Sequence, residues 1–125
     1  MVTLAVSACG PGVSDTTYSI LGGYIFSDAG GPEKTIIYRG DAAPKGIVID
    51  ARVDKYRVVG NRIIVARRPE IQSNGAGPVT TKLSDVCEHW TIDTATHLVS
   101  RLDEKSPDAM LSCNSPYDQD YNPRL

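Results

Sequence analysis

A chain of 125 residues, with 41% hydrophobic and 22% charged residues, has the size and composition of one soluble domain and is too short for two. Its formal net charge of −2 creates no overall field that would favour nucleic acid or an anionic membrane surface. No apolar run approaches the roughly 20 residues that a membrane-spanning helix needs, so the only membrane link we expect is an anchor.

The first stretch of the chain, residues 1–8, is apolar or small and ends at Cys9. The residues Val6-Ser7-Ala8-Cys9 resemble the lipobox of bacterial lipoproteins, where a branched residue and two small residues precede a lipidated cysteine. The resemblance implies that residues 1–8 are a residual signal segment, that Cys9 carries lipid and that residues 9–17 are a flexible linker. In the alternative, residues 2–9 form a short edge strand with a buried cysteine, and the protein is cytoplasmic.

Cysteine parity predicts a disulfide. With Cys9 set aside, Cys87 and Cys113 remain as an even pair, which an oxidising compartment would favour joining. The alternative is two unrelated free thiols, buried as small hydrophobic groups.

The first half of the body reads as short strands with turn residues between them. The segment "YSILGGYIFSDAGG", from Tyr18, predicts one strand with a bulge or kink at Gly22-Gly23, followed by a turn over residues 28–31. Further strands are expected over residues 34–38 and 46–50, separated by the loop "RGDAAPKG".

The clearest element is a hairpin over residues 53–68, because two β-branched runs flank Gly60-Asn61, a pair suited to a tight turn. Pairing outward from the turn sets Val58 against Ile63, Tyr56 against Val65 and Asp54 against Arg67. The first two pairs form an apolar face, and the third is an ion pair at its end. The opposite face carries Lys55, Arg57 and Arg62, with Ile64 and Ala66 between them.

This basic face has two interpretations. It is either a docking surface for an acidic partner or lipid headgroups, or the solvated face of an antiparallel pair, and the second reading is favoured. The long polar stretch of residues 69–85 follows it and is read as a loop that recognises a partner. The residues assigned to partner binding are Lys55, Arg57, Arg62, Gln72 and Asn74.

The last part of the body predicts a strand at "CEHWTID", with Trp90 and Ile92 on its core face, and a returning strand at "LVSRL". Ser106 as N-cap and Pro107 at the first helical position then predict a short helix over residues 107–113. The fold class is therefore α+β, mainly antiparallel β: a small meander sheet with one short C-terminal helix. Residues 18–113 form the compact domain, and residues 114–125 are expected to be a mobile or draped tail.

The order of strands, basic hairpin, "CEHWTID" and late helix resembles that of small uncharacterised bacterial lipoproteins. The residues that carry the resemblance lie in the middle of the chain: Tyr56, Arg62, Ile63, Ile64, Cys87, Trp90, Ile92 and Asp93. The resemblance implies an exported domain and supplies no activity.

No catalytic residues, cofactor or metal site are predicted. Cys87, Glu88, His89 and His97 lack the spacing of a metal site, and Cys87 with His89 lacks a third group that would orient a nucleophile. The prediction is an exported, lipid-anchored monomer of the bacterial periplasm or outer membrane. It would bind a protein partner, such as a toxin or hydrolase that it inhibits, and no nucleic acid. The alternative is a small envelope enzyme or ligand carrier without a recognisable motif.

Overall fold

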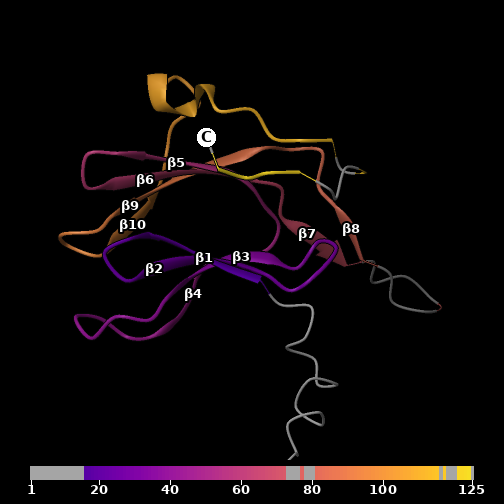
Figure 1. Cartoon of the computed structure of the whole chain (residues 1–125). Helices are drawn as coiled ribbons and strands as arrows, with labels where there is room; N and C mark the ends of the chain where they lie inside the picture. Colours follow the sequence, from indigo (N-terminus) through magenta and orange to yellow (C-terminus); the bar gives the residue numbers. More distant parts are fainter. Residues whose placement is uncertain (1–15, 73–76, 78–80, 116, 118–120, 125) are drawn as a thin grey trace, which may run out of the picture.

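The computed structural model describes residues 16–72, 77, 81–115, 117 and 121–124, and these form two stacked antiparallel sheets with a separate two-stranded ribbon (Figure 1). The first sheet has the strand order β1-β2-β3-β4, and the second has the order β10-β9-β6-β5. The prediction of a mainly antiparallel β protein is confirmed, whereas the single meander sheet was wrong. The two sheets arise because each has one apolar face that must be buried against another layer.

The first sheet is a meander of four strands: β1 (Thr16–Leu21), β2 (Tyr24–Asp28), β3 (Lys34–Tyr38) and β4 (Gly46–Ile49). The Gly22-Gly23 pair, expected to bend one strand, instead forms the turn between β1 and β2. Both glycines have positive φ, 57° and 89°, which only glycine adopts at little cost.

The second sheet contains β5 (Val53–Val59), β6 (Arg62–Arg67), β9 (Glu88–Asp93) and β10 (Leu98–Arg101). The hairpin at Gly60-Asn61 is confirmed, with Val58 opposite Ile63 and Tyr56 opposite Val65. The pairing of Asp54 with Arg67 was wrong. A register shift between Val53 and Lys55 places Val53 opposite Arg67 and turns Asp54 out of the ladder.

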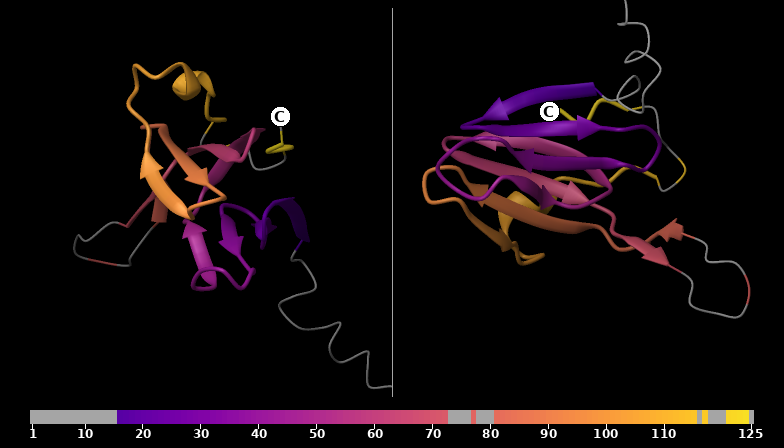
Figure 2. Two further views of the ribbon diagram at one scale, coloured as in Figure 1. Left: turned by 90° about the vertical axis from the view of Figure 1, so that its left-hand side faces the viewer. Right: turned by 90° about the horizontal axis from the view of Figure 1, so that it is seen from below.

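Residues 69–85, predicted to be a loop, contain the ribbon instead. Strands β7 (Glu70–Gln72) and β8 (Thr81–Leu83) pair with each other and extend away from the sandwich (Figures 1 and 2). The ribbon follows β6 and precedes β9, which are themselves paired, so it prolongs the central hairpin of the second sheet.

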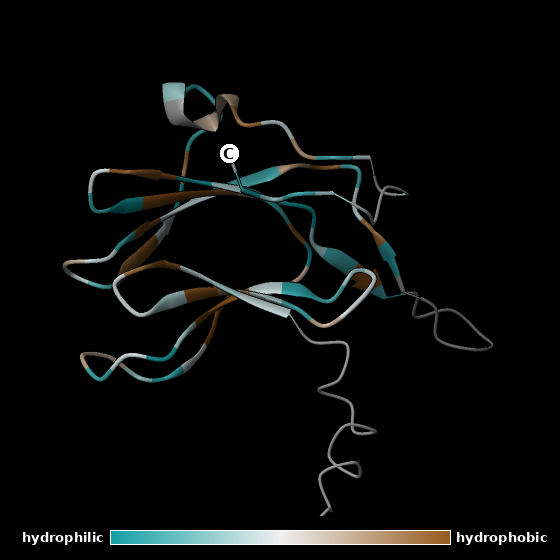
Figure 3. Ribbon diagram, viewed as in Figure 1, coloured by the Kyte–Doolittle hydropathy of each residue, from teal (hydrophilic) through white to brown (hydrophobic). Residues whose placement is uncertain are grey.

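Hydrophobic residues lie in the strands of both sheets, whereas the connections are more polar (Figure 3). The core between the sheets consists of buried side chains from β2, β3, β5, β6 and β9, together with Ile49 of β4. Of the predicted core residues, Tyr56, Ile63, Val65 and Ile92 are buried; Trp90 is half-buried and packs against them. Val58 lies at the edge and is 43% exposed.

A second, smaller core lies on the outer face of the second sheet. Ile64 and Ala66 are buried there by Leu111, with Leu102, Cys87 and Cys113 packed around them. The segment that supplies Leu102 and Leu111 contains a 3-10 turn, Pro107–Met110, in place of the predicted helix over 107–113. Four residues make barely one turn, and Leu111 leaves it to pack on the sheet.

The predicted disulfide between Cys87 and Cys113 is present and fastens this covering segment beside β9. Residues 114–125, beyond the disulfide, were expected to be a mobile or draped tail; of the described residues, Tyr117 is 92% exposed, whereas others contact the body. Asn114 bonds to Asp54, Tyr121 donates a hydrogen bond to the carbonyl of Val53, and the Tyr56 amide donates to the carbonyl of Pro123.

Candidate functional site

A cleft of about 820 Å³ opens at one side of the sandwich, between β1 and the C-terminal residues 121–124. The side chains that give it its character are Tyr18, Phe26, Asp28, Tyr56, Tyr121 and Arg124. The volume lies in the range of roughly 300–1,000 Å³ that is typical of ligand sites. Its walls come from the first quarter, the middle and the end of the chain.

The position of β1 explains one wall. Tyr18 is opposite Phe26, and their rings stack with centroids 6.2 Å apart, so Tyr18 lies on the core side of the first sheet. Phe26 in turn packs on Tyr56 of β5, the last strand of the second sheet. Tyr18 therefore lies one strand beyond the region that β5 covers, and it stays 52% exposed.

The C-terminal residues form the opposite wall. The Tyr56 amide donates to the carbonyl of Pro123 over 2.8 Å, and Arg124 makes a parallel bridge with Tyr56. Residues 122–124 thus line part of the outer edge of β5, and in Figure 2 the C-terminal stretch lies across from β1. A sheet edge that is only partly paired leaves room for further chain.

Charge is distributed unequally along the cleft. The carboxylate of Asp28 is 3.5 Å from the Nζ of Lys34, a lysine only 3% exposed, so its charge is compensated within the protein. Arg124 is exposed and has no ion pair with the carboxylates that the structure describes. Burial raises the pKa of Tyr56, and the nearby charge of Arg124 partly opposes that rise. The Arg124 end of the cleft is therefore cationic and holds a neutral phenol.

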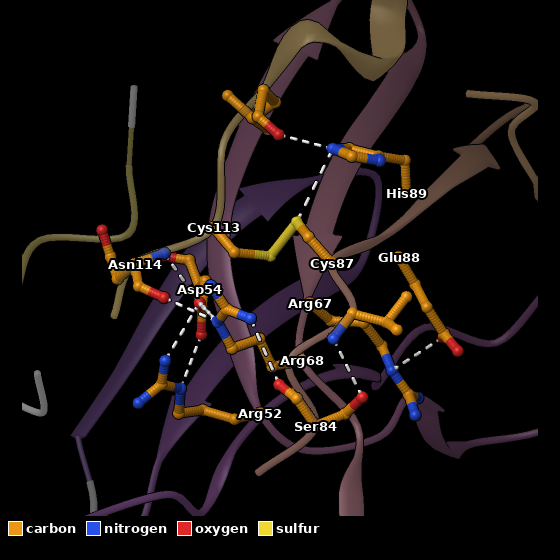
Figure 4. The surroundings of a disulfide bond; sticks show 12 residues. Arg52, Asp54, Arg67, Arg68, Ser84, Cys87, Glu88, His89, Cys113 and Asn114 are labelled. Carbon is orange, nitrogen blue, oxygen red and sulfur yellow. Dashed lines mark hydrogen bonds and ion pairs between the residues drawn. A yellow bond between two sulfur atoms is a disulfide. The ribbon is translucent and has the colours of Figure 1, made fainter. Parts of the chain in front are cut away.

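Next to the cleft lies a buried ionic centre formed by Arg52 and Asp54, both 0% exposed (Figure 4). The guanidinium of Arg52 donates from Nε and Nη2 to the two carboxylate oxygens of Asp54, over 2.6 and 3.0 Å. Such a two-point contact is the strongest form of arginine–carboxylate pairing. Arg68 adds a second positive charge, with its Nε 3.8 Å from the same carboxylate.

The C-terminal segment completes the hydrogen bonding of this centre. The Asn114 amide donates to Asp54 over 2.8 Å, and Arg52 donates to the carbonyl of Ser115 over 3.0 Å. Arg68 donates to the carbonyls of Asn114 and Asp85. Because charged groups and their partners are so fully matched, we assign this centre to stability rather than to ligand binding.

Tyr121 joins the ionic centre to the cleft. Its hydroxyl donates to the carbonyl of Val53 over 2.9 Å and lies 3.4 Å from Asp54. Its ring lines the cleft and contacts the cations of Lys34 and Arg52, 5.3 and 5.4 Å from the ring centroid. Burial, followed by the negative charge of Asp54, raises the pKa of Tyr121, so the hydroxyl remains a donor at any ordinary pH.

The two histidines take part in packing. His89 hydrogen-bonds to the carbonyl of Leu111 and lies 3.7 Å from the sulfur of Cys87, beside the disulfide. His97, in the turn after β9, hydrogen-bonds to Tyr24 through Nδ1 over 2.8 Å and packs edge-on against Tyr38. Within the described residues, no group of three or more His, Cys, Asp or Glu side chains could hold a metal ion.

The predicted partner-binding residues do not come together at the cleft. Lys55, Arg57 and Arg62 are half-buried, and the residues Ile64 and Ala66 between them are covered by Leu102 and Leu111. Gln72 is exposed on β7, in the protruding ribbon. Asn74 and the predicted lipidation site Cys9 lie outside the described residues.

Sequence reasoning missed the cleft because its walls are remote in the chain. One local signal was available: "TTYSIL" is a β-rich strand without a charged residue, which is unusual for a sheet edge.

No helix among the described residues is long and apolar enough to cross a membrane. Comparison of the chain with protein-family models, with curated proteins and with solved structures finds no match.

Proposed function

We propose that this protein is an exported binding protein of the bacterial envelope that recognises a protein partner, such as a toxin or hydrolase, through the cleft beside β1. The observation that carries the proposal is a cleft of about 820 Å³ lined by the rings of Tyr18, Phe26, Tyr56 and Tyr121, with Tyr18 half-exposed inside it. Aromatic side chains that are already partly exposed in a cleft are common anchors of protein interfaces.

Export is supported by the disulfide. A bond between Cys87 and Cys113 persists in the periplasm or outside the cell and is rare in the cytosol. In this proposal the lipobox-like residues Val6-Ser7-Ala8-Cys9 supply a lipid anchor. Labelling with palmitate in a Gram-negative host should therefore mark the wild-type protein and fail in Cys9→Ser; equal labelling of both would remove the anchor from the proposal.

Binding rather than catalysis is supported by the groups in the cleft. The titratable side chains along it are tyrosines, one arginine and one carboxylate that is paired with a buried lysine. The described residues offer no nucleophile with an adjacent base there. They do offer aromatic surface and a cation, which are common at the energetic centres of protein interfaces.

The direct test is affinity capture from envelope extracts with the purified, oxidised protein as bait. We expect one partner to be retained by the wild type and lost with Tyr18→Ala or Arg124→Glu. The predicted alternative contacts are tested in parallel with charge reversal at Arg57 and Arg62. If only that pair abolishes capture, the basic face is the binding surface and the cleft is not.

The cleft volume also supports a second candidate, a carrier of a small ligand. Native mass spectrometry of protein purified from the envelope distinguishes the two. A small molecule retained by the wild type and lost in Tyr18→Ala would favour the carrier, whereas an empty protein that still captures its partner would favour the binding protein.

A further inference from the structure

The outer edge of β1 differs from every other sheet edge in the described structure. Its strand is six residues long, contains neither proline nor a charged residue, and pairs with no described strand on its outer side. Residues 16–19 are all exposed. An edge of this kind presents unpaired backbone amides and carbonyls to any extended chain.

The other three outer edges of the two four-stranded sheets, those of β4, β10 and β5, have features that discourage pairing. β4 is shorter, has a register shift against β3 and is flanked by Lys45 and Asp50. β10 has four residues and ends in Arg101. β5 has Asp54, Lys55 and Arg57 along it and is partly paired by residues 122–124. Short strands, bulges and charges are the usual means of preventing edge-to-edge pairing. β1 also has a register shift, between Ser19 and Leu21, but residues 16–19 before it are regular and uncharged.

The unprotected edge borders the cleft. A strand added beside β1 would direct every second side chain to the face on which Tyr18 lies, and that face is the cleft wall. Tyr18 would then be covered, as Phe26 is covered now. Main-chain bonds to β1 would supply general affinity, and the cleft would select the side chain that enters it.

The charges of the cleft indicate which chain would fit. Asp28 is already compensated by Lys34, but Arg124 is exposed and has no ion pair with a described carboxylate. Tyr56, close to Arg124, has no hydrogen bond from its hydroxyl to a described residue, although it is only 4% exposed. A cation beside a hydroxyl donor suits a carboxylate.

We propose that the partner docks by adding an extended segment to the outer edge of β1, with an apolar side chain against Tyr18 and an acidic side chain at Arg124. This inference rests on the proposed protein-binding function and specifies its mode. The occupant is a β strand of a partner protein, and a second copy of this chain is the competing occupant that the experiment must exclude.

The test begins with a random library of linear peptides displayed on phage, panned on the full chain with its disulfide intact. We expect enrichment of sequences that alternate apolar and polar residues and contain an acidic residue. The consensus peptide is then synthesised and titrated by fluorescence anisotropy. Because truncating an interface anchor commonly costs more than 1–2 kcal/mol, Tyr18→Ala and Arg124→Glu should each weaken binding by about tenfold or more.

Matched controls are available outside the cleft. Ile47→Ala removes an apolar side chain that is 63% exposed on β4, and Arg39→Glu makes the same charge change after β3. Both should bind the peptide within about twofold of wild type. Amide hydrogen exchange should slow in residues 16–21 when the peptide binds, since pairing protects the edge amides.

Three results would overturn the inference: no enriched peptide that binds, equal binding by the cleft variants and the controls, or unchanged exchange in β1. Sedimentation that shows a dimer lost in Tyr18→Ala would assign the edge to a second copy and overturn it as well. Capture of the same envelope partner by wild type, Tyr18→Ala and Arg124→Glu would reject both the cleft and this mode of docking, and only the binding of a partner through another surface would stand. Loss of capture in both variants without slower exchange in β1 would keep the cleft as the binding site and reject the added strand alone.

Discussion

The ionic centre and the cleft lie side by side under the same C-terminal segment, but the polar groups of the centre are buried and paired, whereas those of the cleft are exposed. In the centre, the buried Asp54 accepts hydrogen bonds from the buried Arg52 and from the half-buried Asn114. In the cleft, Arg124 faces solvent and the ring of Tyr18 is half-exposed. The comparison separates charges that maintain the fold from charges and rings that are available to a partner.

The largest expected effect comes from breaking the ionic centre. Asp54→Ala removes the carboxylate that accepts two hydrogen bonds from the buried guanidinium of Arg52 and lies close to Arg68, which should cost about 3–5 kcal/mol of unfolding free energy. Denaturation in urea measures the loss. Asp41→Ala breaks an ion pair with Lys45 that is exposed on both sides, and it should change stability by at most about 1 kcal/mol. Similar losses in the two variants would contradict the assignment of the centre to stability.

Removing the disulfide should have the next largest effect. Cys87 and Cys113 are 26 residues apart, and opening a loop of that length costs about 3–4 kcal/mol in the chain-entropy description. The double variant Cys87→Ala, Cys113→Ala should melt earlier than the oxidised wild type. A reducing agent should lower the melting temperature of the wild type and leave the double variant unchanged; a wild type insensitive to reduction would speak against the bond.

Tyr121 tests the boundary between the two regions. Tyr121→Phe keeps the ring that lines the cleft and deletes the hydroxyl that bonds to Val53 and approaches Asp54. We expect a loss of about 1–2 kcal/mol in stability, because the buried carbonyl loses its donor, with peptide binding at the cleft unchanged. A variant that loses binding and keeps its stability would show that the hydroxyl of Tyr121 acts in peptide binding rather than in the ionic centre.

The smallest effect concerns pH at the base of the ribbon. Burial, and then the negative charges of Glu33 and Asp50, raise the pKa of Glu70. Because the pKa is raised, the Glu70 carboxyl keeps its proton to a higher pH in the folded protein than in the unfolded chain. The stability of the protein therefore falls as the pH rises from about 4.3 through the folded-state pKa. Glu70→Gln should therefore be more stable than wild type at pH 7, by less than about 1 kcal/mol, and equal to it below about pH 4.

The control for that prediction is Glu33→Gln, which removes one of the charges that raise the pKa of Glu70. It should reduce the pH dependence without abolishing it, because burial remains. A pH dependence that is identical in wild type and Glu70→Gln would assign it to another group.

Local features of the fold were predictable from the sequence. The Gly60-Asn61 turn and the alternation around it placed Tyr56, Ile63 and Val65 on the core face, since a tight turn fixes the register of a hairpin. The Cys87–Cys113 bond followed from parity. These inferences depend on neighbouring residues or on simple counting.

The features that failed depend on contacts between distant segments. Asp54 was assigned to Arg67 because an ideal ladder would pair them. The register shift after Val53 takes Asp54 out of the ladder, and its carboxylate instead accepts hydrogen bonds from Arg52 and the C-terminal segment. In place of the predicted helix over residues 107–113 there is a 3-10 turn that ends at Met110, and the next residue, Leu111, packs on the outer face of the second sheet. The cleft joins Tyr18 to Arg124, and no local pattern connects two positions so far apart.

The dependence of Asp54 on the last part of the chain has a consequence for the order of folding. Its partners Asn114 and Tyr121 are 60 and 67 residues away, and the strands β6, β7, β8, β9 and β10 all lie between Asp54 and these partners in the sequence. A chain that emerges from its amino end must keep Arg52 and Asp54 hydrated until those residues arrive, because burying them earlier would leave hydrogen bonds unmade. The centre therefore closes late, and proteases should cleave an incomplete chain much faster than the finished one.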